Sequence, residues 1–233
     1  MITVMIAGIP IGIDNRYDHT ARISADYLTD EAPLFTVYAT DAEIEREDEQ
    51  TDGEFSRGYL ESTVIFRRIA EQLPKYDAVV FHGAVLAKGS KAYAFTAKSG
   101  VGKTTHTRLW LSELGESVHY INGDKPVIRI IDGVPYAYGT PWRGKEGYGT
   151  NESAPLAAIA LLERAEVNSA RIIDADEGTL RLVKQIYIPK DPECAILAMR
   201  VADKIISSTR FVELKCNKEN EAALVAARAM LVE

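Results

Sequence analysis

The segment AKSGVGKTT, residues 97–105, constrains this chain more than any other. It follows the apolar stretch AYAF and leads into THTRLWLSEL, in which Leu109, Trp110 and Leu114 fall on one face of a helix. Strand, glycine-rich loop and helix in this order fit the phosphate-binding pattern G-x-x-x-x-G-K-[ST], with Ala97 in place of the first glycine. The sequence therefore predicts a loop and a helix N-terminus that bind phosphate groups.

Each residue type in this loop has a chemical reason. Gly100 and Gly102 allow backbone conformations that turn successive N–H groups toward an anion, and the following helix adds its own unpaired N–H groups and dipole. Lys103 would reach the β- and γ-phosphates of a nucleotide, the Thr104 hydroxyl would ligate Mg²⁺, and Thr105 would lie near the α-phosphate. An ordinary glycine-rich turn is the alternative. The predicted nucleotide-binding residues are Ala97, Lys98, Ser99, Gly100, Val101, Gly102, Lys103, Thr104 and Thr105.

A nucleotide site of this kind needs a carboxylate for the metal, usually at the end of a neighbouring strand. The segment VHYINGDKPVIR supplies Asp124 directly after an apolar run. We expect Asp124 to hold Mg²⁺ together with Thr104, and to act as general base toward an acceptor hydroxyl. Asn, Gly and Asp also favour turns, so the alternative is that residues 122–124 form only a turn.

Two further side chains are candidate catalytic residues. His82, in a His-Gly pair before the predicted hairpin, is either a structural hydrogen-bonding group or a catalytic one. Arg143 lies in the glycine-containing segment TPWRGKEGYGTNESAP, where it and Lys145 would clamp phosphate charge in the transition state. The alternative for this segment is a mobile surface loop. The remaining histidines and the two cysteines, Cys194 and Cys216, show no metal-ligand spacing.

Composition narrows the class of protein. The chain of 233 residues is 46% hydrophobic and 26% charged, which is typical of a globular protein and excludes collagenous or wholly disordered chains. Two cysteines make no disulfide framework, and the apolar runs are too short to span a bilayer, so we expect a cytoplasmic protein without a signal peptide. The net charge of −7 argues against nucleic acid as a partner.

The charge is unevenly distributed. Residues 41–54 hold eight acids and one arginine, which accounts for the whole net charge, whereas residues 88–108 carry five lysines and arginines and no acid. The acidic run is predicted to be a solvated helix face or loop, rather than a metal site or docking surface. A cationic stretch around the glycine-rich loop suits a nucleoside triphosphate.

Hydrophobic patterns predict a mixed α/β fold. We expect strands at 3–9, 34–39, 78–81, 84–87, 91–95, 118–121, 127–131, 134–138, 170–173 and 211–214, with residues 156–162 ambiguous. Helices are expected from Tyr59 to Pro74, around 176–187 and 192–208, and from about Lys218. Turn residues at 88–90 predict that an antiparallel hairpin, instead of a helical crossover, leads into the glycine-rich loop. Residues 1–75 are expected to pack as a small α+β segment on a core formed by residues 76–233.

The combination FHGAVLAKGSKAYAFTAKSGVGKTT…YINGDKPV resembles the catalytic domain of HPr kinase/phosphorylase and, more broadly, the phosphoenolpyruvate carboxykinase-like P-loop superfamily. The resemblance covers about residues 78–130. It implies a mixed β-sheet P-loop core with flanking helices, ATP and Mg²⁺ bound through Lys103 and Thr104, and His82 near the transferred phosphate. The family's paired aspartates are Gly123-Asp124 here, so one carboxylate is missing. The segment PWRGKEGYGTN is more similar to uncharacterised HPr-kinase-like bacterial proteins.

These features predict an ATP- and Mg²⁺-dependent kinase that phosphorylates a hydroxyl: a serine of a peptide or protein, or a small metabolite such as free serine. The catalytic candidates are Asp124, His82, Lys103 and Arg143. The resemblance also suggests a homo-oligomer. Three alternatives stay open: a nucleotide-binding regulatory module without turnover, a carboxykinase-like enzyme, and a simple NTPase. ATP and GTP are not distinguished by the sequence.

Overall fold

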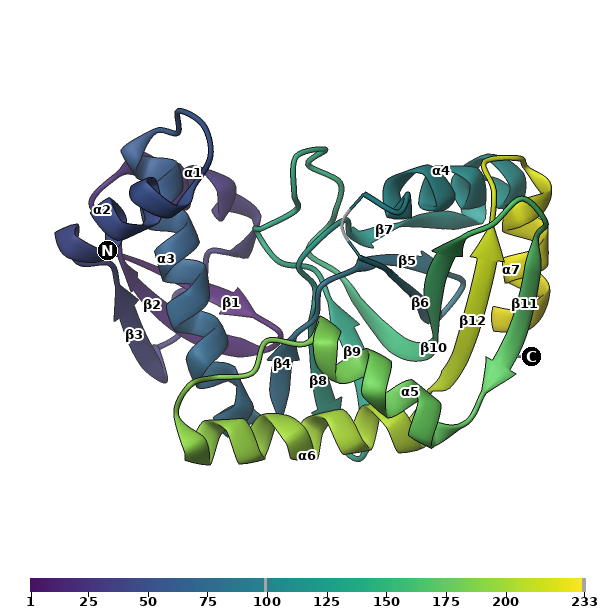
Figure 1. Cartoon of the computed structure of the whole chain (residues 1–233). Coiled ribbons are helices and arrows are strands. Elements are labelled where there is room, and N and C mark those ends of the chain that lie inside the picture. The colour runs from purple at the N-terminus through teal and green to yellow at the C-terminus, as the bar shows by residue number, and fades with distance from the viewer. Residues whose placement is uncertain (99, 232–233) are drawn as a thin grey trace.

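Two β-sheets organise the chain (Figure 1). The structure is a computed structural model and describes residues 1–98 and 100–231, in which the strands form a three-stranded sheet and a nine-stranded sheet. The smaller sheet and helices α1 to α3 lie at the N-terminal end of the molecule, and the larger sheet carries the rest of the chain between two layers of helices. The expected mixed α/β class is confirmed.

The N-terminal part begins with a hairpin where the sequence predicted a single strand over residues 3–9. Strands β1 (Ile2–Ile6) and β2 (Ile9–Asp14) pair antiparallel, and β3 (Phe35–Tyr38) pairs parallel with β2. The chain reverses at Ala7 and Gly8, whose φ angles are +52° and +69°. That turn lies inside an apolar run, so hydrophobicity alone did not mark it.

Helices cover one side of this small sheet. They are α1 (Asp18–Ile23), α2 (Asp41–Gln50) and α3 (Arg57–Gln72). The acidic run does form a helix, because Thr40 and Glu43 build a reciprocal capping box at the start of α2. Arg67 and Arg68 of α3 form ion pairs with Glu47 and Glu43 of α2. The acids of α2 are therefore partly neutralised by the neighbouring helix.

The large sheet is mixed and bends at one long strand. Its order is β4-β8-β9-β10-β6-β5-β7, and β12, with β11 beside it, pairs with β10. The start of β10 pairs antiparallel with β9, and the remainder pairs parallel with β6 and β12. The segment left ambiguous by the sequence thus belongs to the central strand. The strands are β4 (Ala78–Val80), β5 (Ala84–Lys88), β6 (Lys91–Thr96), β7 (Val118–Asn122), β8 (Val127–Ile131), β9 (Val134–Tyr138), β10 (Ser153–Arg164), β11 (Ser169–Ile173) and β12 (Arg210–Cys216).

Both predicted hairpins of the core are present. β5 and β6 pair antiparallel around Gly89, and β8 and β9 pair antiparallel around Asp132 and Gly133. All three turn residues have positive φ, as tight hairpin turns require. A hairpin therefore leads directly into the glycine-rich loop.

Helices lie on both faces of the large sheet. On one face, α4 (Lys103–Leu114) and α7 (Glu221–Met230) contact each other, and Trp110 packs among buried alanines of α7. On the other face, α5 (Ala175–Leu182) and α6 (Pro192–Ser208) bury Leu182, Ala198, Val201 and Ile205. Among the described residues, no helix is long and apolar enough to cross a membrane.

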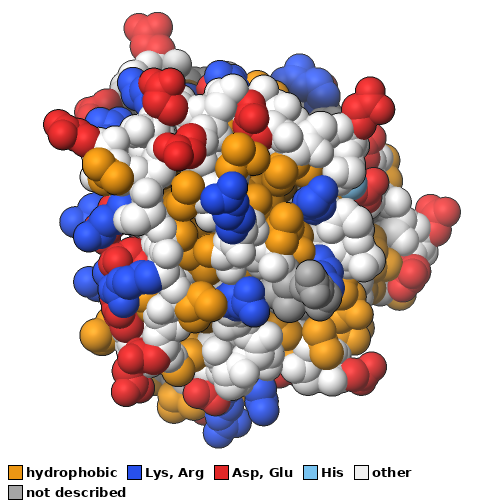
Figure 2. Space-filling view, turned by 90° about the vertical axis from the view of Figure 1, so that its right-hand side faces the viewer, with side chains coloured by type: hydrophobic (Ala, Val, Ile, Leu, Met, Phe, Trp, Pro, Cys, Tyr) orange, Lys and Arg blue, Asp and Glu red, His pale blue; other side chains and the backbone are white. Residues whose placement is uncertain are grey.

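The end of the molecule that carries β11 and α7 has a mixed surface (Figure 2). Hydrophobic side chains gather near the middle of this face with lysines and arginines among them, and acidic side chains lie mainly toward its margin. Exposed hydrophobic residues of this end of the molecule include Val167 in the loop before β11, Ile172 of β11 and Leu224 of α7.

Candidate functional site

Four parallel strands end at one edge of the large sheet. Both β6 and β7 run antiparallel to β5, while β10 runs parallel to β6 and to β12. The carboxyl ends of β6, β7, β10 and β12 therefore lie at the same edge. A cavity of about 770 Å³ opens there, lined by the loops after these strands, the first turns of α4 and the loop between β9 and β10.

The glycine-rich loop connects β6 to α4 and forms one wall of this cavity. Gly100 and Gly102 have φ angles of +78° and +119°, a region that favours glycine. α4 begins at Lys103, and no described side chain caps its first N–H groups. These N–H groups are available to bind an anion, to which the helix dipole adds.

Lys103 crosses the loop that precedes it. Its Nζ lies 3.3 Å from the carbonyl oxygen of Ala97, to which it donates a hydrogen bond. The side chain is half-buried, and burial lowers the pKa of the ammonium, an effect that the nearby Asp124 carboxylate opposes and Lys125 strengthens. A partly desolvated ammonium at the mouth of the loop is placed to pair with a bound anion.

Arg164, the last residue of β10, supports the loop from the side. Its Nε donates to the carbonyl oxygen of Val101 at 2.9 Å, and its guanidinium also bonds the carbonyl oxygen of Gly100. The carbonyls are thereby turned toward the arginine, which leaves the other face of the loop to its N–H groups. The sequence did not identify Arg164, because its proximity depends on the pairing of β6 with β10.

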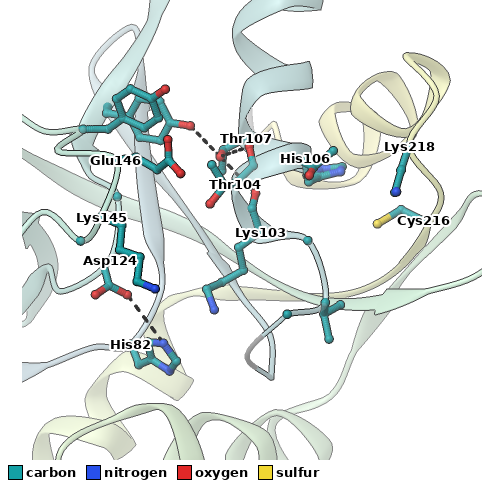
Figure 3. Close-up of a pocket in the computed structure, with 18 of the residues that line it drawn as sticks. His82, Lys103, Thr104, His106, Thr107, Asp124, Lys145, Glu146, Cys216 and Lys218 are labelled. Atoms are coloured by element: carbon teal, nitrogen blue, oxygen red, sulfur yellow. Dashed lines mark hydrogen bonds and ion pairs between the residues drawn. The ribbon is translucent and has the colours of Figure 1, made fainter. Parts of the chain in front are cut away.

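Asp124 lies across the cavity from Lys103, in a turn that its neighbour fixes (Figure 3). The side-chain oxygen of Asn122 accepts hydrogen bonds from the backbone N–H groups of Asp124 at 2.9 Å and Lys125 at 2.8 Å. The amide nitrogen of Asn122 donates to Thr140 in turn. Residues 122–124 do form the turn that the sequence analysis gave as the alternative, and this turn also directs the Asp124 carboxylate into the cavity.

His82 faces the same carboxylate. Its Nε2 lies 3.7 Å from Oδ1 of Asp124. Burial lowers the pKa of the imidazole, and the ammonium groups of Lys125 and Lys103 lower it further, so the ring is neutral at pH 7. A neutral imidazole beside a carboxylate is suited to accept or relay a proton.

Steric crowding explains why a glycine, Gly83, follows His82. A Cβ atom at Gly83 would lie 2.4 Å from a ring carbon of Phe81 and 2.7 Å from the carbonyl oxygen of Phe95. The backbone N–H of Gly83 donates to the carbonyl oxygen of Asp124 at 3.1 Å. The His-Gly pair therefore holds the start of β5 close to the Asp124 turn.

Gly123 lies where the resemblance leads one to expect a second aspartate. A Cβ atom there would lie 3.2 Å from the carbonyl oxygen of Tyr148 and 3.3 Å from that of Arg143. The loop between β9 and β10 thus occupies the space beside Gly123. The backbone N–H of Gly123 donates to the carbonyl oxygen of Tyr148 at 2.8 Å. A side chain at position 123 would therefore crowd the backbone of the loop between β9 and β10.

That loop places its two cations differently. The guanidinium of Arg143 forms an ion pair with Asp26 at 3.2 Å and lies over the ring of Tyr27, 5.8 Å from its centroid, so the N-terminal part of the chain engages it. Lys145 instead lines the cavity and, in Figure 3, points toward the end that holds Asp124 and His82. The lysine that pairs with the Asp124 carboxylate is Lys125, at 3.7 Å, whereas Lys145 forms no ion pair within residues 1–98 and 100–231.

Aromatic contacts connect this loop to α4. The rings of Tyr148 and Tyr120 stack with centroids 4.7 Å apart, and Arg108 contacts both Tyr148 and Glu146 at 2.9 Å. The hydroxyls of Tyr120 and Thr107 are 2.7 Å apart. The sequence analysis did not predict that these residues belong to the site. The available indication was that Thr107 and Arg108 follow Thr104 by three and four residues, which places them on the same face of the helix.

Most predicted site residues come together. Lys98, by contrast, is exposed, Ala97 is buried beneath the loop, and Ser99 lies outside the described residues. Among the described residues there is no group of three or more His, Cys, Asp or Glu side chains suited to a metal. The predicted residues that line the cavity are His82, Gly100, Val101, Gly102, Lys103, Thr104, Thr105, Asp124 and Arg143.

Comparisons with known proteins add little to this geometry. No protein-family model matches the sequence, and no curated protein matches it. Among solved structures, one match is the Hpr(Ser) kinase/phosphatase from Coxiella burnetii. It is 8% identical, with a TM-score of 0.37, over 64% of this chain and 94% of the other.

Proposed function

We propose that the protein is an ATP- and Mg²⁺-dependent phosphotransferase that transfers the γ-phosphoryl group to a hydroxyl. One observation carries the proposal: a glycine-rich loop and an uncapped helix N-terminus with Lys103 face the Asp124–His82 pair across a single cavity. The first half of that arrangement is suited to a polyphosphate, and the second to a hydroxyl that must lose its proton. The resemblance of residues 78–130 to HPr-kinase-like domains agrees with this reading.

The donor set fits Mg²⁺. This ion prefers oxygen ligands, keeps several waters, and is usually held by one or two carboxylates together with substrate phosphates. The Thr104 hydroxyl and the Asp124 carboxylate, both lining the cavity, would hold it. When bound, the ion would neutralise charge on the β- and γ-phosphates.

The transfer itself would use side chains on both walls. The acceptor oxygen bonds to the γ-phosphorus while the bond from that phosphorus to the β–γ bridging oxygen breaks, and ADP leaves with the electron pair. The hydroxyl proton passes to Asp124, with neutral His82 adjacent to receive it or hold its position. Lys103 and the loop N–H groups stabilise the charge on the transferring group.

Of the two cations that the sequence suggested as a phosphate clamp, Arg143 and Lys145, we assign the phosphate contact to Lys145. Since the Arg143 guanidinium is engaged by Asp26, the ammonium of Lys145, which lines the cavity and forms no ion pair among the described residues, is better placed to contact the transferring phosphoryl group. Arg143 then serves to fix the loop on which Lys145 lies.

The decisive test is Lys103→Ala, measured by Mg·ATP binding and turnover. We expect both to be abolished with the fold intact, because the variant removes the loop's only side-chain cation directed at the phosphates among the described residues. Lys88→Ala, on the β5–β6 hairpin that leads into the loop but outside the cavity, is the control with the same loss of charge and should behave as the wild type. Unchanged turnover in Lys103→Ala would refute the assignment.

The acceptor can be identified by mass. The wild type would be incubated with Mg·ATP and a pool of hydroxyl metabolites and serine peptides, and a gain of about 80 Da, one phosphoryl group, would mark the acceptor. Binding without transfer to any member of the pool would favour the regulatory module, in which the single carboxylate does not support catalysis.

A further inference from the structure

The imidazole ring of His82 is not held in place by its own contacts. Its Nε2 atom lies 3.7 Å from Oδ1 of Asp124, which is longer than a hydrogen bond, and the ring makes no hydrogen bond to residues 1–98 or 100–231. The side chain is also 38% exposed, so packing confines it only in part. The position of the ring relative to the Asp124 carboxylate therefore depends on how firmly the backbone at residue 82 is held.

The connection between α5 and α6 clamps that backbone. A short 3₁₀-helix, η4 (Val183–Gln185), follows α5, and the chain then passes beside β4 (Figure 1). The backbone N–H of His82 donates to the carbonyl oxygen of Gln185 at 2.6 Å, and that of Tyr187 donates to the carbonyl oxygen of Val80 at 2.9 Å. The connection thus pairs antiparallel with the segment that leads into His82.

Side chains add a second clamp at the same point. Thr96, the last residue of β6, is fully buried, and its hydroxyl donates to the carbonyl oxygen of His82 at 2.7 Å. The same hydroxyl lies 2.8 Å from the side-chain oxygen of Gln185. The next residue, Ala97, begins the glycine-rich loop and accepts a hydrogen bond from Lys103. One buried hydroxyl therefore joins His82, Gln185 and the entry to the loop.

Gln185 is a firm support for this clamp. Leu182 before it and Ile186 after it are buried in the same hydrophobic core as Phe81. The described residues that line the cavity do not include Gln185, so its side chain would contact neither the nucleotide nor the acceptor. Any effect of Gln185 on the reaction must therefore pass through Thr96 and His82.

We propose that Gln185 and Thr96 are positioning residues, which hold His82 against Asp124 for the transfer of the acceptor proton. In the proposed function, on which this inference rests, His82 receives that proton or holds its position. A group that moves a proton must lie within hydrogen-bond reach of it, so a small displacement of His82 slows the transfer. The glycine-rich loop keeps its own support, because β6 pairs with β5 on one side and with β10 on the other.

The test separates chemistry from nucleotide binding in the full chain. Gln185→Met removes the side-chain amide at nearly constant length and leaves the backbone bond to His82 in place. ADP release from Mg·ATP would be measured with the pool of hydroxyl metabolites and serine peptides. We expect kcat to fall about tenfold, the size of one hydrogen bond, and KM for Mg·ATP to change by less than about twofold. Gln72→Met, which removes a side-chain hydrogen bond with Lys75 outside the cavity, is the matched control and should behave as the wild type.

Further variants test whether the effect passes through His82. Thr96→Val removes the hydroxyl with little change in volume and should lower kcat at least as much as Gln185→Met. Thr96→Ser keeps the hydroxyl and should restore most of the rate. In a His82→Ala background, Gln185→Met should have no further effect on kcat, because the group that it positions is absent. A purely structural role of Gln185 would lower kcat by the same factor in both backgrounds.

The outcomes distinguish this inference from the function on which it rests. The inference is overturned if Gln185→Met turns over as fast as the wild type, or if it lowers kcat equally with and without His82. If His82→Ala alone leaves kcat unchanged, the inference also falls, while the assignment of the phosphate-binding loop stands. If the wild type releases no ADP, or if Lys103→Ala leaves Mg·ATP binding unchanged, the proposed function itself fails and the inference fails with it.

Discussion

Replacing His106 with leucine should make the protein more resistant to mild acid. His106 lies beside Phe95, with ring centroids 5.5 Å apart, and burial lowers the pKa of its imidazole from the ordinary value of 6.5 to about 4. Between these two pH values the unfolded chain binds a proton that the folded protein does not. Stability contributed by the neutral ring is therefore fully present above pH 6.5 and is lost as the pH falls toward 4.

The magnitude follows from the two pKa values. Proton linkage gives about 2 kcal/mol less unfolding free energy at pH 5 than at pH 8 from this one residue, and about 3 kcal/mol less at pH 4. Leucine has a similar volume, does not titrate and leaves no unpaired ring nitrogen. The difference in unfolding free energy between His106→Leu and the wild type should therefore grow by about 2 kcal/mol between pH 8 and pH 5.

Urea denaturation at the two pH values, without nucleotide or Mg²⁺, measures this difference. Comparing the change between pH values removes every effect of the substitution that does not depend on protonation, including altered packing. NMR titration of the His106 ring protons provides a direct check, since the ring should stay neutral well below pH 6. A change below about 0.5 kcal/mol between pH 8 and pH 5 would show that the folded ring accepts a proton freely, and would refute the burial argument.

Two further predictions concern the walls of the cavity. Gly83→Ala should lower the unfolding free energy by about 2–3 kcal/mol in urea denaturation, because its Cβ would meet Phe81 and the carbonyl oxygen of Phe95; a variant as stable as the wild type would contradict that crowding. Lys145→Met should reduce the rate of phosphoryl transfer about 100-fold, whereas Arg143→Met, the matched loss of charge two residues earlier, should mainly lower Tm by about 2 °C. If Arg143→Met lowered kcat more than Lys145→Met did, Arg143 would be the residue that contacts the phosphoryl group.

Local patterns predicted the part of the fold that depends on neighbours in sequence. The β5–β6 hairpin, the loop and α4 follow from turn residues, glycines and helical spacing within residues 84–114. The hairpin of β1 and β2 was missed because its turn, Ala7-Gly8, interrupts an apolar run without a polar or proline signal. The nature of residues 156–162 was ambiguous because a strand buried on both faces shows no alternation.

The sequence predicted the cavity residues that lie within short continuous motifs. Asp124 and His82 were chosen from short motifs, whereas Arg164 and Lys218 reach the cavity only because β10 pairs parallel with β6 and β12 pairs parallel with β10. Such pairings join residues more than 50 positions apart, and no local periodicity encodes them. The different placements of Arg143 and Lys145 depend on contacts with the N-terminal part, which no pattern within the loop reveals.

The contacts of the loop between β9 and β10 explain why the N-terminal part belongs to the site although none of its residues lines the cavity. Trp142 donates from Nε1 to the hydroxyl of Ser62 at 3.0 Å and packs on Phe66 of α3, while the Tyr27 hydroxyl donates to the carbonyl oxygen of Thr150 at 3.0 Å. Together with the Arg143–Asp26 pair, these contacts anchor both ends of the loop on residues 1–75. Between the anchors lie three glycines with positive φ, at 144, 147 and 149, and among them Lys145, which has no such anchor within the described ranges. The position of Lys145 therefore depends on contacts with the small sheet and its helices as well as with the core, so residues 1–75 help to shape a cavity that residues 76–233 line.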